Sequence, residues 1–180
     1  LNIADFARAN GTKIGTLLFE KSDEAVAAME AGRCDGYTDD TGSLAAVRST
    51  LKVPADWLVL EGVISKEPLG MMVRKGDDKF FDVVRWTLFA MIQAEESGVT
   101  MANVDEMAGK STNPDIRRLL GAEGDLGKAL GVDNKFVVNV VKGVGNYGEM
   151  FDRTVGPLGI PRGINNLWNK GGLHYPPPIR

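Results

Sequence analysis

The sequence predicts an α/β fold for its first third and an all-helical remainder. Short apolar segments at residues 13–19 and 34–38 alternate with helical periodicity at residues 22–31 and 41–51, which is the order of a βαβα unit. From Asp78 onward the hydrophobic period is helical throughout. These observations predict a small α/β lobe followed by a helical arm, with the best internal boundary near residue 76.

The first helices carry recognisable end signals. The helix predicted at residues 1–10 ends at Asn10, and Gly11 stands at its C′ position. It has no N-cap, which favours the interpretation that upstream sequence is missing. The helix predicted at residues 22–31 has Asp23 and Glu24 at its positive end and stops at Gly32.

Two further apolar segments, at residues 57–65 and 69–74, are predicted as crossing strands because Pro68 lies between them and cannot donate to a ladder. The arm is predicted as short helices separated by glycines, at residues 80–96, 103–108, 114–120, 135–141, 147–153 and 164–169. Such short helices need a partner surface to be stable.

Composition excludes several classes of function. The net charge of −3 argues against nucleic acid as a partner, because phosphate binding needs a basic field. The longest apolar runs, such as residues 83–92, are too short and too interrupted to span a bilayer. The single cysteine cannot form an internal disulfide, and the single histidine, His174, lies in a proline-rich tail where no catalytic triad can be assembled.

The candidate site surrounds Asp40. This carboxylate lies where a short strand ends and a helix begins, the edge at which open α/β sheets bind small molecules. A carboxylate there suits an ammonium group, which it can hold by charge-assisted hydrogen bonds. Tyr37 and Thr41 flank it closely enough to line a crevice, and Ser65 and Glu67 lie where the crossing strands would pass.

The same stretch is compatible with other interpretations. Asp39 and Asp40 without further context suit a solvated turn that caps the helix from Thr41. A calcium loop has the pattern Asp-x-Asp-x-Asp-Gly, which does not match the spacing of Asp35, Asp39, Asp40 and Gly42. No metal site is therefore expected, and no cofactor is expected either. Arg33 is interpreted as a surface ion-pairing residue in a helix-to-strand turn.

Several motifs together resemble periplasmic amino-acid-binding proteins of ABC importers, and in particular the subfamily with broad L-amino-acid specificity. They are Ala31-Gly-Arg-Cys-Asp35, Thr38-Asp-Asp40, Ile64-Ser-Lys-Glu-Pro-Leu-Gly70, Thr112-Asn-Pro-Asp-Ile-Arg-Arg-Leu-Leu-Gly121, Val144-Gly-Asn-Tyr-Gly-Glu149 and Leu167-Trp-Asn-Lys-Gly-Gly172. The resemblance implies the type II periplasmic-binding-protein fold, two α/β lobes joined by crossing strands. In that frame residues 1–65 are the second lobe, 66–76 the hinge return strand and 77–180 a helical arm that packs on the first lobe, most of which is missing.

The resemblance also implies roles. Asp40 matches the aspartate that holds the substrate α-ammonium in the family, and Asp35 matches a structural one. The family's clamp for the α-carboxylate would lie upstream of Leu1. The implied partners are an amino acid or similar zwitterion and a membrane permease, the implied location is the periplasm, and the implied function is capture and delivery without catalysis.

Two alternatives stay open at this point. One is a non-catalytic assembly role, in which the helical arm pairs with a complementary N-terminal half or a second copy. The other is a dehydratase, because some dehydratases share the binding-protein fold, and Asp40 with Glu67 could then act as acid and base.

Overall fold

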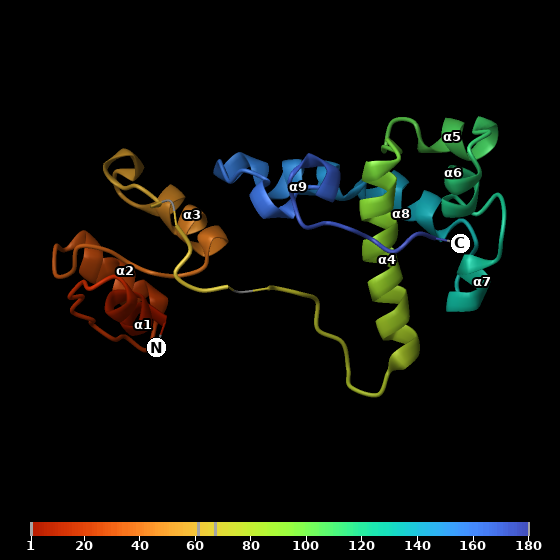
Figure 1. Cartoon of the computed structure of the whole chain (residues 1–180). Coiled ribbons are helices and arrows are strands. Elements are labelled where there is room, and N and C mark those ends of the chain that lie inside the picture. Colours follow the sequence, from red (N-terminus) through yellow and green to blue (C-terminus); the bar gives the residue numbers. More distant parts are fainter. Residues whose placement is uncertain (1, 61, 67, 180) are drawn as a thin grey trace. The chain divides into compact units, whose positions relative to one another are not determined.

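The computed structural model describes residues 2–60, 62–66 and 68–179. The chain divides into two compact units, Leu1–Leu69 with Leu158–Ile160, and Gly70–Pro157 with Pro161–Arg180 (Figure 1). The domain boundaries expected at residues 65 and 76 stay predictions.

In the residues that the structure describes, the first unit contains three helices connected by extended chain. They are α1 (Asn2–Ala9), α2 (Ser22–Glu30) and α3 (Thr41–Thr50), and a short 3₁₀ turn, η1 (Pro54–Asp56), follows. The end of α2 lies where the sequence predicts it: Gly32 has φ +70°, and the N–H of Arg33 donates to the carbonyl of Ala28 at 2.9 Å. The predicted helix boundaries in this unit are therefore close to the observed ones.

The four predicted strands are wrong for this structure. Within residues 2–60, 62–66 and 68–179 no strand forms, and one isolated bridge joins Leu167 and His174. Residues 13–19, 34–38, 58–60, 62–66 and 68–73 make no backbone–backbone hydrogen bond to another segment of the described chain. A strand is stable only when a neighbour completes its ladder, and the described residues supply no such neighbour.

The second unit is helical around one core. Its helices are α4 (Asp78–Glu96), α5 (Val104–Lys110), α6 (Pro114–Leu119), α7 (Leu126–Leu130), α8 (Phe136–Val144) and α9 (Tyr147–Thr154). The longest, α4, packs against α8 and α9 (Figure 1). The buried core includes Ala94, Val99, Val104, Leu119 and Val141, and Ile179 near the C-terminus joins it.

Helix capping explains several starts in this unit. The Asp77 carboxylate accepts from the N–H of Phe80 at 3.1 Å, and the Asn113 side chain accepts from the N–H of Asp115 at 2.9 Å, just before Pro114 at the first helical position. Asn146 and Glu149 form a reciprocal capping box at the start of α9.

Two expectations for the arm need correction. The helix predicted at residues 164–169 is replaced by two 3₁₀ turns, η3 (Gly163–Asn165) and η4 (Trp168–Lys170), because Asn166 between them is extended, with ψ 166°. The five-residue helix α7 was not predicted, since its sequence is too short and too rich in flanking glycine to show a period. A third short turn, η2 (Gly156–Leu158), follows α9.

Candidate functional site

Asp40 occupies the N-cap position of α3. Its backbone is extended, with φ −59° and ψ 145°, and its carbonyl accepts the N–H of Leu44 at 2.8 Å, the first bond of the helix. Its side chain makes no capping hydrogen bond to α3. The interpretation of Asp40 as a capping side chain is therefore wrong. Its carboxylate lies near the positive end of the helix and is not used in capping α3.

Both carboxylate oxygens of the neighbouring Asp39 accept hydrogen bonds. One carboxylate oxygen accepts the Tyr37 hydroxyl at 2.6 Å, and the other accepts the backbone N–H of Asp40 at 2.8 Å. The hydrogen bond to the Asp39 carboxylate, together with partial burial, raises the pKa of Tyr37 above its usual value of 10.0. Tyr37 is thus fixed on Asp39 rather than on Asp40.

These contacts distinguish the two carboxylates. In the described part of the chain, the Asp40 side chain has neither a hydrogen bond nor an ion pair, although it is half-buried. A half-buried carboxylate that lacks a cation gains most from an incoming ammonium group, because part of its desolvation is already complete. Asp40 fits an ammonium ligand better than Asp39 does.

The remaining predicted site residues are less defined. Thr41 is the first residue of α3 and is exposed, and its N–H is one of the first-turn donors that have no partner within the helix. Ser65 is half-buried, and Glu67 lies outside the described residues. The structure brings Tyr37, Asp40 and Thr41 into one short segment; the binding roles of Tyr37, Asp40, Thr41 and Glu67 stay predictions.

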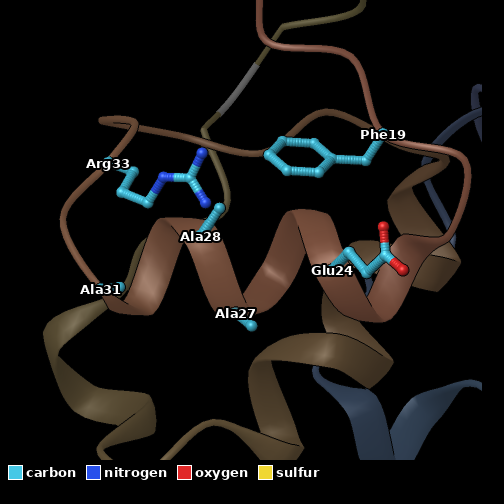
Figure 2. A pocket seen from close by; sticks show the side chains of 6 residues that line it. All are labelled: Phe19, Glu24, Ala27, Ala28, Ala31 and Arg33. Atoms are coloured by element: carbon cyan, nitrogen blue, oxygen red, sulfur yellow. The ribbon is translucent and has the colours of Figure 1, made fainter.

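A pocket that the sequence did not indicate lies on α2. It has a volume of about 380 Å³ and is lined by Phe19, Glu24, Ala27, Ala28, Ala31 and Arg33 (Figure 2). Figure 2 shows Phe19 and the guanidinium of Arg33 on the same side of the helix, and the Arg33 Cζ atom lies 5.9 Å from the centre of the Phe19 ring. This cation–π contact is what Arg33 makes, in place of the expected surface ion pair.

The pocket is separate from the predicted site, because none of Tyr37, Asp40 and Thr41 lines it. Its wall is the small-residue face of α2, where three alanines recur at helical spacing. That recurrence was the sequence signal for a face open to a neighbouring segment. The pocket therefore combines an alanine-lined wall with the charged residues Glu24 and Arg33.

Among residues 2–60, 62–66 and 68–179, no three His, Cys, Asp or Glu side chains gather in a way that could hold a metal ion. In the same part of the chain, no helix combines the length and the apolar character needed to cross a membrane.

Comparison with known proteins relates the whole chain to transport proteins, although no family model matches it. The chain is 54% identical over 183 residues to YhdW of Escherichia coli (strain K12), whose name describes an amino-acid ABC transporter-binding protein. It is 53% identical over 185 residues to the general L-amino acid-binding periplasmic protein AapJ of Rhizobium johnstonii. It is 45% identical over 183 residues to the glutamate/glutamine/aspartate/asparagine-binding protein BztA of Rhodobacter capsulatus.

A solved structure gives the same result. An ABC transporter periplasmic binding protein from Brucella ovis, with glutathione bound, superposes with a TM-score of 0.92 at 54% identity, over 99% of this chain and 57% of that one. Each of the three curated relatives is matched over all of this chain but over only 54% of its own length. The chain thus spans about half the length of the curated relatives it matches.

The class of protein follows from these findings. The chain is homologous, along its whole length, to solute-binding proteins of ABC transporters. More narrowly, the resemblance to periplasmic amino-acid-binding proteins that the sequence motifs indicated is confirmed, and the structure corresponds to part of such a protein.

Proposed function

We propose that this chain is part of the extracytoplasmic solute-binding component of an amino-acid ABC transporter, and that Asp40 holds the α-ammonium group of the solute. The observation that carries the proposal is the contrast between two adjacent carboxylates. Asp39 is occupied by Tyr37 and by the N–H of Asp40, whereas the Asp40 carboxylate has no partner in the described chain. Capture of a zwitterion requires one such anionic group and no covalent chemistry.

The proposed solute is an α-amino acid or a small peptide that carries a free α-amino acid end. The relatives' names describe general L-amino acids and glutamate, glutamine, aspartate and asparagine, and the Brucella ovis protein holds glutathione. Glutathione presents an α-ammonium and an α-carboxylate on its glutamyl residue, so one ammonium-binding aspartate suits all of these solutes. In this scheme Thr41 and Tyr37 line the crevice beside Asp40, and Glu67 contacts the solute side chain.

The α-carboxylate of the solute needs a cation or backbone donors, and we place these in the half of the protein that this chain does not contain. A zwitterion bound only by its ammonium group leaves the carboxylate desolvated without a partner, which costs several kcal/mol. The 180-residue chain alone is therefore expected to bind amino acids weakly. The lobe assignment, with residues 1–65 as second lobe and 66–76 as hinge return, belongs to the same proposal.

Calorimetry of a completed protein tests the assignment. The chain is fused to the part of YhdW that it does not match, and L-glutamate, L-glutamine and glutathione are titrated into it. Asp40→Asn is expected to weaken binding about 10- to 100-fold, since a hydrogen bond to a charged group contributes about 1.5–3 kcal/mol. The matched variant Asp39→Asn is expected to have a smaller effect. Unchanged affinity in Asp40→Asn with a normal unfolding transition would refute the role of Asp40.

Delivery to a membrane permease from the periplasm completes the proposal. The named relatives are transporter-binding and periplasmic proteins, which supports this partner and this location. A solute-stimulated increase in ATP hydrolysis by a reconstituted importer would test it. Failure of the fused protein to stimulate any amino-acid importer, despite tight solute binding, would contradict the transport role.

A second candidate function is assembly with a complementary polypeptide, and the exposed apolar side chains of the unpaired segments favour it. Leu18 is 92% exposed and Met72 is 98% exposed, and Leu58, Leu60, Val63 and Leu69 are also largely exposed. Exposed apolar residues on segments without a ladder partner favour pairing with added strands. Gel filtration tests this candidate: a compact monomer that does not associate with the separately produced remainder of YhdW would contradict assembly.

A further inference from the structure

The C-terminal segment, defined here as residues 162–179, folds back onto the second unit. Leu167 is buried, and Ile179 lies in the helical core. The backbone of the segment closes on itself: the N–H of Trp168 donates to the His174 carbonyl at 3.0 Å, and the N–H of His174 donates to the Asn166 carbonyl at 3.1 Å. His174 therefore lies at the point where the segment turns back on itself.

The His174 ring lies against the start of α9. It packs edge to face on Tyr147, with the ring centres 4.4 Å apart and the planes at 83°. The Nδ1 atom of His174 is buried and has no hydrogen-bond partner among the described residues. An imidazolium ion would place a charged N–H at this atom with nothing to accept it, whereas the neutral ring can leave it as an unpaired acceptor at a lower cost.

Charged groups from two elements act electrostatically on the His174 ring, Arg162 from the segment and Glu95 from α4. Arg162, in the segment itself, lies with its Cζ 5.4 Å from the centre of the Tyr147 ring. Glu95 of α4 accepts two hydrogen bonds from Arg162, one at each carboxylate oxygen, both at 3.1 Å. The Glu95 carboxylate is already paired with Arg162. It therefore does not serve as the counter-ion of a protonated His174.

These surroundings favour neutral His174. Burial lowers the pKa of His174 below its usual 6.5, the Arg162 charge lowers it further, and the Glu95 carboxylate opposes this only in part. The neutral ring stabilises the folded segment fully above about pH 6.5, and this contribution is lost as the pH falls toward the lowered value.

We propose that His174 is a pH-sensitive latch: neutral, it holds the C-terminal segment on the second unit, and protonated, it loosens that segment while helices α4 and α8 stay folded. The device needs no ligand and does not depend on the proposed transport function. Full protonation increases the equilibrium constant for loosening of the segment. The factor is the ratio of the acid dissociation constant of the packed ring to that of the exposed ring.

The chain offers an unambiguous readout, because His174 is its only histidine. Proton NMR of the His174 imidazole gives its ionisation midpoint directly. Amide hydrogen exchange, corrected for the chemical exchange rate at each pH, reports opening of residues 164–179. Lowering the pH from about 7.5 to about 5 is expected to accelerate exchange several-fold in that range and to leave the amides of α4 and α8 unchanged.

The matched variant is His174→Phe, which keeps an aromatic ring against Tyr147 and cannot ionise. Its segment is expected to stay protected at both pH values. Three results would overturn the latch: an imidazole midpoint at or above 6.5, the same pH dependence in wild type and variant, or equal acceleration of the segment and the core. If His174→Phe does not fold, the wild-type midpoint and the comparison of segment with core still decide the matter.

Discussion

Arg162 donates two hydrogen bonds to Glu95, 67 positions earlier in the sequence, and each carboxylate oxygen accepts one at 3.1 Å. The pair is mostly buried, with side-chain exposures of 17% and 9%. The guanidinium also lies over the rings of Tyr147 and Phe151, with its Cζ atom 5.4 and 5.2 Å from their centres. One ion pair therefore connects α4, α9 and the C-terminal segment.

Breaking this pair on one side is expected to destabilise the second unit strongly. Glu95→Ala leaves the mostly buried Arg162 charge without its counter-ion, which costs about 3–5 kcal/mol. The double variant Glu95→Leu with Arg162→Met removes both charges and is expected to recover much of that loss. Urea unfolding followed by circular dichroism measures both free energies.

An exposed pair provides the control for this prediction. Lys110 and Glu106 are 3.1 Å apart on α5, with side-chain exposures of 77% and 67%. Glu106→Ala is expected to change the free energy of unfolding by less than about 0.5 kcal/mol, as is usual for helix-surface pairs. Equal losses for Glu95→Ala and Glu106→Ala would show that burial of the first pair has no energetic consequence.

Asn146 is expected to contribute more than an ordinary helix cap. Its side-chain oxygen accepts the N–H of Glu149 at 2.9 Å, and its buried amide nitrogen donates to the carbonyl of Val99 at 2.8 Å. Asn146→Ala removes the cap and leaves the Val99 carbonyl without its donor, for a total of about 2–4 kcal/mol. Asn113→Ala removes a cap alone and is expected to cost about 1 kcal/mol. Thermal unfolding of both variants gives the difference, and equal losses would contradict a role for the Val99 bond.

The helices could be predicted because their determinants are local. Asp77, Asn113 and Asn146 each cap a helix with a side chain only two or three residues from its partner N–H. The stop at Gly32 likewise depends on one residue that adopts a positive φ. Signals within one helical turn are fully present in the sequence, whatever surrounds the segment.

The strands could not be settled in this way, because pairing is not local. Residues 13–19 have the apolar, β-branched character of a strand, yet Leu18 is almost fully exposed and no ladder forms in the described chain. Whether such a segment is a strand depends on neighbours that the sequence pattern cannot supply. The chain covers only 54% of the matched YhdW sequence.

In the candidate site, too, the features that depend on local sequence could be predicted and the others could not. The position of Asp40 at the start of a helix could be predicted, since it depends on its own segment. The occupation of Asp39 by Tyr37 was not predicted, because neither a spacing nor a period indicates which of two adjacent carboxylates a hydroxyl will choose. The Arg162–Glu95 pair was missed for a third reason, since its partners come from distant elements.

Tyr37 is expected to make stability depend on pH in the alkaline range. Its pKa is raised, so below about pH 10 the hydroxyl is protonated in both the folded and the unfolded chain. Above that pH the unfolded chain loses the proton first, and the free energy of unfolding falls until the folded hydroxyl also ionises. Asp39→Asn removes the carboxylate that causes most of the shift and is expected to lower the midpoint of one of the three tyrosines. Tyrosinate absorbance measures this, and an unchanged titration curve would contradict the Tyr37–Asp39 hydrogen bond.

Gly148 is expected to tolerate no side chain, because α9 approaches the buried ion pair most closely there. A Cβ atom at Gly148 would lie 2.9 Å from Cδ of Glu95 and 3.1 Å from Nη1 of Arg162. Gly148→Ala must displace one of these groups from its partner, and a loss of about 1–3 kcal/mol is expected, as for overpacked cores. Gly143 provides the matched control: it lies on α8 with nothing within 4 Å of the corresponding Cβ, so Gly143→Ala is expected to stabilise by about 0.5–1 kcal/mol. Urea unfolding is expected to show a lower free energy of unfolding for Gly148→Ala and a higher one for Gly143→Ala. If the ion pair determines how closely α9 approaches α4, the Gly148→Ala loss is smaller in the Glu95→Leu, Arg162→Met background. A Gly148→Ala loss that is unchanged in that background would contradict this.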